Sequence, residues 1–339
     1  MNEELASLIQ NYPLPLGWET PELWNDTLKV SSFELELIGL MSVSKSGQRI
    51  TASAGGIKNA HTLTQKVSNL FRAYFELLER ISIIEAEKSN HTVFIGCDET
   101  GKSVQILKAE QIFLKDGAHE KWCYSKSNGV AAHTRWLSAC KAAANELIER
   151  DRILRSWYAG SKPTKLHLSE ATLPDLSPYY SLNVYDFGEN VVGAFGFPEQ
   201  PEIPCFYGFG LGTTLSQSAQ HAIQEALQRL GFLWGEDLPS HLPECVPGPE
   251  FHQETFLHPI GIHELKEWLE GRKSNRDDIQ IIDFNNSPSD KNNEILFVDL
   301  TPENLRGLVF ISKAVSTTRL PLTFGMGNPK APTTFSPKS

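Results

Sequence analysis

Three long stretches of the chain carry apolar residues at helical intervals. An apolar residue every three or four positions forms one stripe along a helix, so each stretch predicts a helix with one buried face. A segment rich in glycine and other turn residues precedes each stretch, so the same turn-and-helix unit is predicted three times. The predicted helices are residues 63–86, 137–158 and 215–233, and the preceding segments are Gly55-Gly56, Ser127-Asn128-Gly129 and residues 207–212.

Shorter stretches between and after these helices predict strands, a short helix and loops. The alternation of strands and helices predicts an α/β (α+β) fold with a βαβ-like layered body. Proline and glycine predict irregular structure in the first 30 residues, in two internal loops and in most of the chain after Pro321. The strands are residues 33–43, 49–54, 191–197, 279–284, 295–300 and 308–315, the helical segments are 263–270 and a start at 301–303, and the loops are 169–180 and 236–249.

Composition and charge exclude several classes of protein. The net charge of −10 at pH 7 leaves no basic surface for a phosphodiester backbone, so nucleic acid is not expected as a partner. The five cysteines are widely spaced and include no CxxC pair, which predicts reduced thiols in a cytoplasmic protein. No stretch approaches the roughly 18 apolar residues that span a membrane, so no membrane insertion is expected.

Each predicted helix carries a motif with two acidic or carboxamide side chains three positions apart, followed by arginine. Positions three apart share one helix face, so the first two motifs place like charges side by side. Magnesium compensates such pairs because it prefers oxygen ligands and binds carboxylates together with substrate phosphates. An arginine can also pair with phosphate oxygens. The motifs are residues 76–80 (ELLER), 146–150 (ELIER) and 225–229 (EALQR).

The glycine-containing turns can present backbone N–H groups to an anion. The turn and the glutamates of one unit lie roughly five helical turns apart, so a phosphate site requires several units together. A single ExxER motif usually forms only a solvated helix face, but three in parallel contexts are harder to explain in that way. The sequence contains no Walker loop, no Rossmann fingerprint and no histidines at metal-binding spacing, and the motifs contain no covalent nucleophile.

The motifs resemble those of a known family, the YcaO superfamily. Residues 127–132 (SNGVAA) and 146–151 (ELIERD) are similar to its central signature, SNGxAAG followed by ExxERD. Residues 76–80 resemble its first ExxER element, residues 210–228 resemble its glycine-turn and ALxExxQ element, and residues 320–325 (LPLTFG) look like its PLxFG segment. The resemblance spans roughly residues 50–330. It implies a YcaO-like fold in which repeated strand-turn-helix units surround a nucleotide site.

The resemblance also implies cofactors and residue roles. ATP and Mg²⁺ are the expected cofactors. Four glutamates are expected to hold magnesium, and four further residues are expected to contact the nucleotide, whereas no catalytic residue is assigned. The expected metal ligands are Glu76, Glu79, Glu146 and Glu149, and the expected nucleotide contacts are Ser127, Asn128, Arg150 and Glu225.

Three departures from the family pattern bear on activity. His133 stands where the family has glycine after the alanine pair, and His221 stands where it has arginine four residues before the third-helix glutamate. Because of these two replacements, the affinity for the nucleotide is expected to differ from that of other family members. The family's PxPxP-like tail is replaced by residues 329–337 (PKAPTTFSP), which concerns catalysis, because that tail reaches toward the active centre in azoline-forming members.

The implied function is ATP-dependent cyclodehydration of Cys, Ser or Thr in a ribosomally made precursor peptide, giving thiazoline or oxazoline rings as in bacteriocin biosynthesis. Two alternatives are thioamide formation with a TfuA-type partner, and a degenerate scaffold of a modification complex. A separate leader-binding partner is expected, in a homo-oligomer or hetero-complex. The predicted divisions are an N-terminal arm and first strand (1–45), a YcaO-like catalytic domain (46–330) and a Pro-containing tail (331–339).

Overall fold

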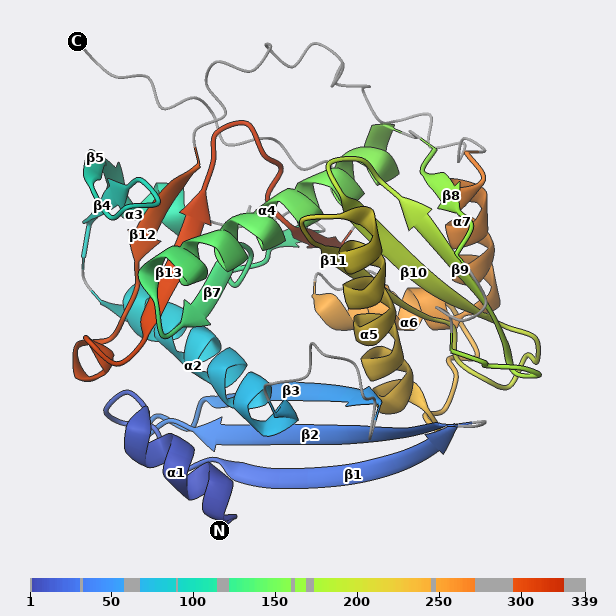
Figure 1. Cartoon of the computed structure of the whole chain (residues 1–339), viewed down its shortest axis with the longest axis horizontal. Coiled ribbons are helices and arrows are strands. Elements are labelled where there is room, and N and C mark those ends of the chain that lie inside the picture. Colours follow the sequence, from blue (N-terminus) through green and yellow to red (C-terminus); the bar gives the residue numbers. More distant parts are fainter. Residues whose placement is uncertain are drawn as a thin grey trace.

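Three helices and three sheets alternate around a common centre (Figure 1). Helix α2 (Asn69–Lys88) lies between the first sheet, made of β1 to β3, and the second, made of β4, β5, β7, β12 and β13. Helix α4 (Trp136–Ala159) lies between the second sheet and the third, made of β8 to β11. Helix α5 (Leu215–Leu233) lies between the third sheet and the first. The helices therefore direct residues from distant parts of the sequence toward the same region. The computed structural model describes residues 2–30, 33–57, 68–89, 91–114, 122–159, 162–168, 174–244, 248–271 and 295–325.

The three predicted helices are confirmed, but two of the glycine segments predicted as turns before them are strand residues: Gly55-Gly56 lies in β3 (Arg49–Ile57) and residues 207–211 lie in β11 (Phe206–Leu211). Helix α2 spans Asn69–Lys88, α4 spans Trp136–Ala159 and α5 spans Leu215–Leu233. The Ser68 hydroxyl accepts a hydrogen bond from the Phe71 N–H (3.1 Å), and the Thr214 hydroxyl accepts one from the Gln217 N–H (3.2 Å), so both helices begin at capped residues. The start predicted for the first helix, residues 63–67, lies outside the described residues.

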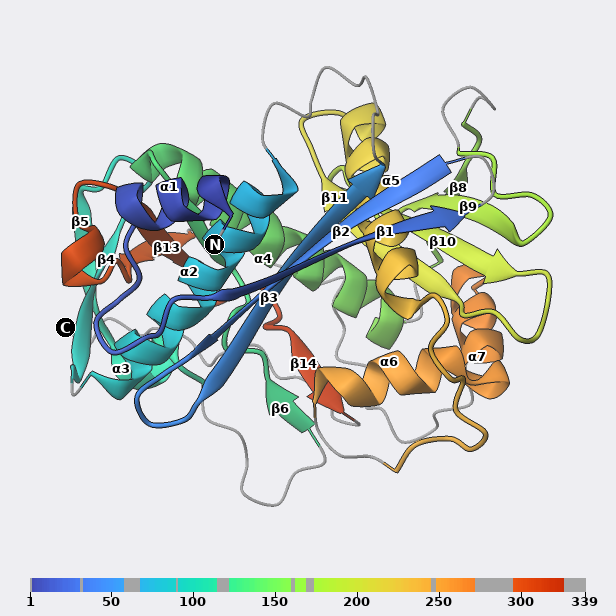
Figure 2. The ribbon, with the colours of Figure 1, turned by 90° about the horizontal axis from the view of Figure 1, so that it is seen from below.

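The first sheet lies beneath α2 and α5, and Figure 2 shows it from below. It has the order β1-β2-β3, with β1 at Glu22–Val30, β2 at Phe33–Val43 and β3 at Arg49–Ile57. The last two strands confirm the predicted pair. The expectation of an irregular leading segment was wrong, because helix α1 (Glu3–Asn11) and β1 occupy much of it. Leu5 and Leu8 of α1 are buried in the core beside α2.

The second sheet carries the turn that precedes α4. Its order is β5-β4-β12-β13-β7, and it packs on α4 through β7 and β13. The strand predicted at 279–284 lies outside the described residues, and the helix predicted from 301–303 is a single 3-10 turn, Glu303–Leu305. The strands are β4 (Val93–Cys97), β5 (Ser103–Lys108), β7 (Val130–His133), β12 (Leu296–Asp299) and β13 (Phe310–Val315), with α3 (Ala109–Ile112) after β5.

The third sheet has the order β11-β10-β9-β8, and its strand β11 lies against α5. A Cβ atom at Gly208 would stand 2.2 Å from the Ala226 nitrogen, and one at Gly210 would stand 2.6 Å from the Ala222 nitrogen. The glycines of this segment therefore permit close contact between the strand and helix backbones. The strands are β8 (Thr164–Leu166), β9 (Tyr180–Asp186), β10 (Val191–Pro198) and β11 (Phe206–Leu211).

The remaining elements complete the body near the third sheet. Helices α6 (Pro249–Leu257) and α7 (Pro259–Leu269) follow α5, so the predicted helix at 263–270 begins earlier than expected and has a partner that was not predicted. A two-stranded sheet joins β6 (Trp122–Tyr124) to β14 (Thr323–Gly325). In the described ranges, residues 174–179 and 236–244 are irregular, as predicted.

All strand pairings in the described part of the chain are antiparallel. The predicted α+β layering is confirmed, but the βαβ-like connection was wrong, since each long helix leads from a strand of one sheet to a strand of another. No helix of the described residues is both long and apolar enough to cross a membrane.

Candidate nucleotide and metal site

The three long helices bring their acidic motif residues into electrostatic contact. Glu79 of α2 interacts with Glu146 of α4, and both Glu146 and Glu149 interact with Glu225 of α5. Four of the five predicted acidic site residues thus meet across three helices, and Glu76 interacts with Glu79 along α2. The expectation that a site needs residues from several units agrees with this arrangement.

The first motif is held by backbone groups of neighbouring strands. Glu76 accepts a hydrogen bond from the Ser53 N–H of β3 (3.3 Å), and its other oxygen accepts one from Arg80 (2.6 Å). Glu79 accepts a hydrogen bond from the Ala132 N–H of β7 (2.6 Å). Burial raises the pKa of Glu79 well above its usual value, and Glu146 and Glu76 raise it further, while the Ala132 N–H opposes the shift.

The second motif is the more deeply enclosed. The Arg150 guanidinium lies 3.5 Å from the Glu149 carboxylate, and the buried Nε of Arg150 has no hydrogen-bond partner among the described residues. Burial raises the pKa of Glu149 to about 8, and Glu225 and Glu146 add to the shift against the opposing effect of Arg150. Burial likewise raises the pKa of Glu146, although Arg150, Lys313 and the Val130 N–H oppose it. These carboxylates lack a full complement of cations.

The Ser127-Asn128-Gly129 turn is fixed by a buried lysine that sequence analysis missed. The Lys313 ammonium of β13 donates hydrogen bonds to the Lys126 carbonyl (3.1 Å) and the Asn128 carbonyl (3.0 Å). Burial lowers the pKa of Lys313 to about 8, and Glu146 opposes this. The Asn128 side chain is buried and its Oδ1 has no hydrogen-bond partner within the described part of the chain, whereas Ser127 is exposed. Asn128 therefore offers an acceptor for a ligand.

In the third motif, Glu225 and Gln228 contact different elements. Glu225 is exposed and accepts a hydrogen bond from the Phe209 N–H of β11 (3.2 Å). Gln228 points to α2, where it accepts a hydrogen bond from Arg72 (3.5 Å), and it donates one to the Ser53 carbonyl (3.4 Å). Arg72, a second residue that was not predicted, thus links α2 to α5 and lies near Glu76 and Glu225.

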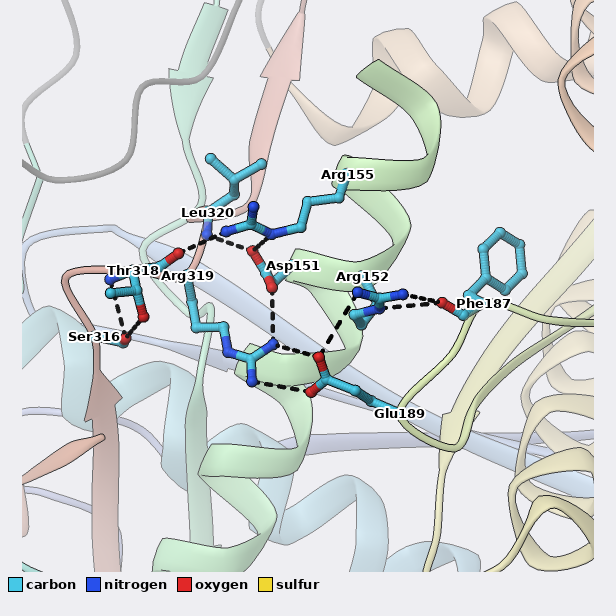
Figure 3. A network of polar contacts seen from close by, with 9 residues as sticks. All are labelled: Asp151, Arg152, Arg155, Phe187, Glu189, Ser316, Thr318, Arg319 and Leu320. Carbon is cyan, nitrogen blue, oxygen red and sulfur yellow. Dashed lines mark hydrogen bonds and ion pairs between the residues drawn. The ribbon is translucent and has the colours of Figure 1, made fainter. Parts of the chain in front are cut away.

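Asp151, which follows the second motif, anchors the C-terminal segment that was compared with PLxFG (Figure 3). Its fully buried carboxylate accepts hydrogen bonds from Arg155 (2.7 Å), Arg319 (3.0 Å) and the Leu320 N–H (2.8 Å). Arg319 also pairs with Glu189 in the β9–β10 turn. The network joins α4 to two segments distant in sequence and fixes the helix just beyond Arg150.

The donor set suits magnesium bound together with phosphate. No three His, Cys, Asp or Glu side chains among the described residues are close enough to hold one metal ion by themselves. Mg²⁺ usually takes only one or two protein carboxylates and completes its shell with waters and substrate phosphates. The half-buried carboxylate of Glu146 and the buried carboxylate of Glu149, both with raised pKa values, fit such an ion. Asn128 Oδ1 and Arg150 Nε fit a polar ligand beside it.

The departures from the family pattern fall at two different places. His133 ends β7, where its Nδ1 accepts a hydrogen bond from the Arg135 N–H (3.2 Å). Burial and Arg135 lower its pKa. His221 lies exposed on α5, one turn before Glu225, with its Nδ1 3.3 Å from the Leu211 carbonyl oxygen. The altered tail, residues 329–337, lies outside the described residues.

Comparison with known families defines the class of this fold and site. The model of a family described as YcaO cyclodehydratase, binding ATP and Mg²⁺, matches residues 96–310. The match covers more than half of the chain, so the chain belongs to the YcaO family. ATP and Mg²⁺ are accordingly its cofactors, as predicted. The matched range contains α4 and α5 but begins after α2, so the roles of Glu76 and Glu79 rest on other observations. No curated protein sequence matches the chain.

Solved structures share the fold at low sequence identity. YcaO from Methanopyrus kandleri, bound with AMPPCP and Mg²⁺, is 17% identical with a TM-score of 0.61, over 97% of this chain and 93% of its own. The E. coli microcin synthetase McbBCD complex with pro-MccB17 bound is 15% identical with a TM-score of 0.54, over 87% of each chain. A heterocyclase in complex with substrate and cofactor is 13% identical with a TM-score of 0.50, over 93% of this chain and 52% of its own.

The raised carboxylate pKa values predict that magnesium-dependent nucleotide binding tightens with pH. Bound magnesium requires ionised carboxylates, so each carboxyl that must lose a proton contributes up to about tenfold in affinity per pH unit below its pKa. With the pKa of Glu149 at about 8, calorimetric titration with Mg·ATP should give higher affinity at pH 7.5 than at pH 6.5, with proton release to the buffer. A pH-independent affinity would contradict the role of these groups.

The same shift fixes the sign of the effect on folding. A carboxyl whose pKa rises from 4.5 to about 8 on folding binds its proton more tightly in the folded protein. The stability of the ligand-free protein should therefore fall as pH rises between these two values, and Mg·ATP should restore it. Thermal unfolding across this range, with and without Mg·ATP, measures both effects.

Proposed function

We propose that the chain is an ATP-dependent cyclodehydratase that forms thiazoline or oxazoline rings from Cys, Ser or Thr residues of a ribosomally made precursor peptide. The observation that carries this proposal is the arrangement of three helices that brings the charges of Glu79, Glu146, Glu149 and Glu225 within electrostatic reach of one another, with Glu146 also near the Lys313 that holds the Asn128 turn. A YcaO chain with this set retains the acidic residues expected of a nucleotide and magnesium site. A scaffold would not require a buried carboxylate such as Glu149 beside two further acidic side chains, Glu146 and Glu225.

We assign the residues as follows. Glu146 and Glu149 hold magnesium from α4, and Glu76 and Glu79 hold it from α2. Arg150 contacts a phosphate, since its unpartnered Nε leaves a donor free. Ser127, Asn128 and Glu225 contact the nucleotide. Magnesium, when bound, neutralises the charge that develops on the phosphates during transfer.

The reacting nucleophile belongs to the substrate. The three helix motifs supply carboxylates, one carboxamide and arginines, but no thiol or hydroxyl. A Cys, Ser or Thr side chain of the peptide therefore adds to the preceding backbone carbonyl and loses its proton. The resulting oxyanion takes the γ-phosphoryl group, ADP leaves, and elimination of phosphate with the amide proton gives the azoline. The original amide oxygen leaves in the phosphate.

A separate protein is proposed to present the precursor. The E. coli microcin synthetase resembles this chain in fold, and its structure is of a multi-protein complex with its pro-peptide bound. A presenting partner would hold the leader while the core segment reaches the site. This division of labour gives affinity through effective concentration, so the contacts at the site itself need not be strong.

The product mass tests the proposed function. Intact-mass analysis of the precursor, incubated with this chain, its partner and Mg·ATP, should show a loss of about 18 Da per ring, since each ring transfers one oxygen to phosphate. Phosphate and ADP should form in proportion, without pyrophosphate. Thioamidation would instead add about 16 Da, because sulfur replaces oxygen. An unchanged mass with neither ADP nor phosphate formed would favour the scaffold and refute the enzyme.

A further inference from the structure

A cavity of about 330 Å³ is lined by residues that lie one helical turn from Glu149 on α4 and from Glu225 on α5. It lies between α4, the β9–β10 turn and the segment that joins β11 to α5. Its volume is near the lower end of the range for ligand pockets, which is about 300–1,000 Å³. Its lining includes Asn145, Ile148, Glu189, Asn190, Gln217 and His221.

The cavity extends the glutamate site along two helices. Asn145 lies one helical turn before Glu149 on α4, and His221 lies one turn before Glu225 on α5. Residues four apart share one helix face, so Asn145 lies on the face of α4 that carries Glu149, and His221 lies on the face of α5 that carries Glu225. Glu79 accepts a hydrogen bond from the Ala132 N–H (2.6 Å) and Glu146 one from the Val130 N–H, both in β7 directly after the turn that carries Asn128. A second reactant can therefore approach from the cavity side.

The lining offers uncharged polar groups and few charges. Among the described residues that line it, none is Lys or Arg. Carboxamides come from three elements, namely Asn145, Asn190 and Gln217, and Ile148 adds an apolar wall. Gln217 Oε1 accepts hydrogen bonds from the Thr213 N–H (3.0 Å) and hydroxyl (2.8 Å), and Asn190 Nδ2 donates one to the Thr213 carbonyl (3.5 Å), so Gln217 offers a ligand its Nε2 and Asn190 its Oδ1. A carboxamide donates and accepts hydrogen bonds, which matches the alternating N–H and C=O groups of a peptide backbone. A phosphate would lack the cations that normally bind it.

The acidic wall residue, Glu189, is neutralised and held in place (Figure 3). Arg319 makes two hydrogen bonds to its carboxylate, at 3.2 and 2.9 Å, and Arg152 lies 3.7 Å away. Arg152 also donates to the Phe187 carbonyl at 3.1 and 2.8 Å. Glu189 and Asn190 both adopt positive φ angles, 51° and 59°, in this turn. Non-glycine residues in this region persist only where their surroundings hold them, so this wall is preorganised.

We propose that this cavity is the subsite for the reacting segment of the substrate peptide. Resting on the proposed function, the assignment places two or three uncharged residues in extended conformation here, with the amide to be activated directed toward Glu149 and Glu225. Asn145, the Gln217 Nε2 group and Asn190 Oδ1 pair with the peptide backbone, and Ile148 contacts the small reacting side chain. His221 lies where the two substrates meet.

Two blocked tripeptides, N-acetyl-Gly-Cys-Gly-amide and N-acetyl-Gly-Ser-Gly-amide, test the subsite. The full chain, labelled at Ile and Leu methyl groups and saturated with Mg²⁺ and a non-hydrolysable ATP analogue, is titrated and followed by NMR. The Ile148 and Leu211 methyl signals should shift and saturate at about millimolar peptide, the affinity expected for so small a ligand. Asn145→Trp fills the cavity, and Gln220→Trp, at an exposed α5 position outside the lining, is the matched control.

The outcomes separate this inference from the proposed function. Asn145→Trp should weaken tripeptide binding at least tenfold more than Mg·ATP binding, and Gln220→Trp should change neither. Absent methyl shifts at 20 mM peptide (about twenty times the expected dissociation constant), with Mg·ATP still bound, would overturn the subsite and leave the nucleotide site standing. Equal loss of both ligands in Asn145→Trp would assign the cavity to the nucleotide and also overturn the subsite. Loss of Mg·ATP binding by the unmodified chain would instead refute the proposed function.

Discussion

Glu149→Gln should reduce ATP turnover at least about a hundredfold, the scale of losing one group that stabilises charge in a transition state. The carboxamide keeps the size of the side chain but cannot ionise, so it is a poor magnesium ligand. The protein should fold at least as well, because the carboxyl is buried with a pKa of about 8 and its ionised form is costly in the free protein. Coupled-enzyme measurement of ADP release, beside thermal unfolding, gives both results.

Glu146→Gln should have the same effects on turnover and folding, since Glu146 is the other acidic residue of this motif and also has a raised pKa. Glu303→Gln is a suitable control, because Glu303 is largely exposed and pairs only with Arg306 among the contacts of the described residues. Its turnover should be unchanged. Wild-type ATP consumption by either α4 variant would show that the carboxylate is not a magnesium ligand.

Asp151→Ala should lower the free energy of unfolding by about 3–5 kcal/mol, the usual cost of removing one partner from a buried ion pair. The carboxylate is fully buried and accepts three hydrogen bonds, two of them from arginines. Its removal leaves Arg155 and Arg319 without that partner and releases the Leu320 N–H. Urea unfolding monitored by circular dichroism measures the change.

Asp237→Ala is the matched control, because Asp237 is exposed in the irregular segment after α5. Its free energy of unfolding should change by no more than about 0.5 kcal/mol. If Asp151→Ala were equally mild, the network around Asp151 would contribute little to stability. The anchoring of residues 319–320 to α4 would then need another explanation.

The parts of the fold that the sequence predicts well are those with long local periodicity. The helix at 215–233 agrees with α5 at both ends, and the predicted 137–158 helix differs from α4 by one residue at each end. Capping and apolar spacing act within a few residues and are visible in sequence. The three acidic motifs could be grouped because they recur at equivalent places on equivalent helices.

Other features depend on tertiary contacts. Three prolines suggested an irregular leader, yet β1 is stabilised by pairing along its whole length with β2. Helix α6 begins with Pro249, which a reading by composition assigns to the preceding loop although proline suits the first turn of a helix. Lys313 looked like an ordinary strand lysine, because only the paired strands β13 and β7 bring it to the Asn128 turn. Its acceptors are backbone carbonyls, which have no signature in sequence.

The contact between β11 and α5 has a consequence for how the site tolerates change. At Gly208 the nearest helix atoms are all backbone atoms, so the spacing of strand and helix there is set by main-chain contact. Glu225 directly precedes Ala226, one of the residues in that contact, so the position of Glu225 depends on the distance between β11 and α5. A methyl group added at Gly208 would push α5 away from β11 and would displace the Glu225 carboxylate with the helix. Substitutions elsewhere in the core can be accommodated by repacking of side chains. A substitution at Gly208 instead shifts the helix backbone and therefore the position of Glu225.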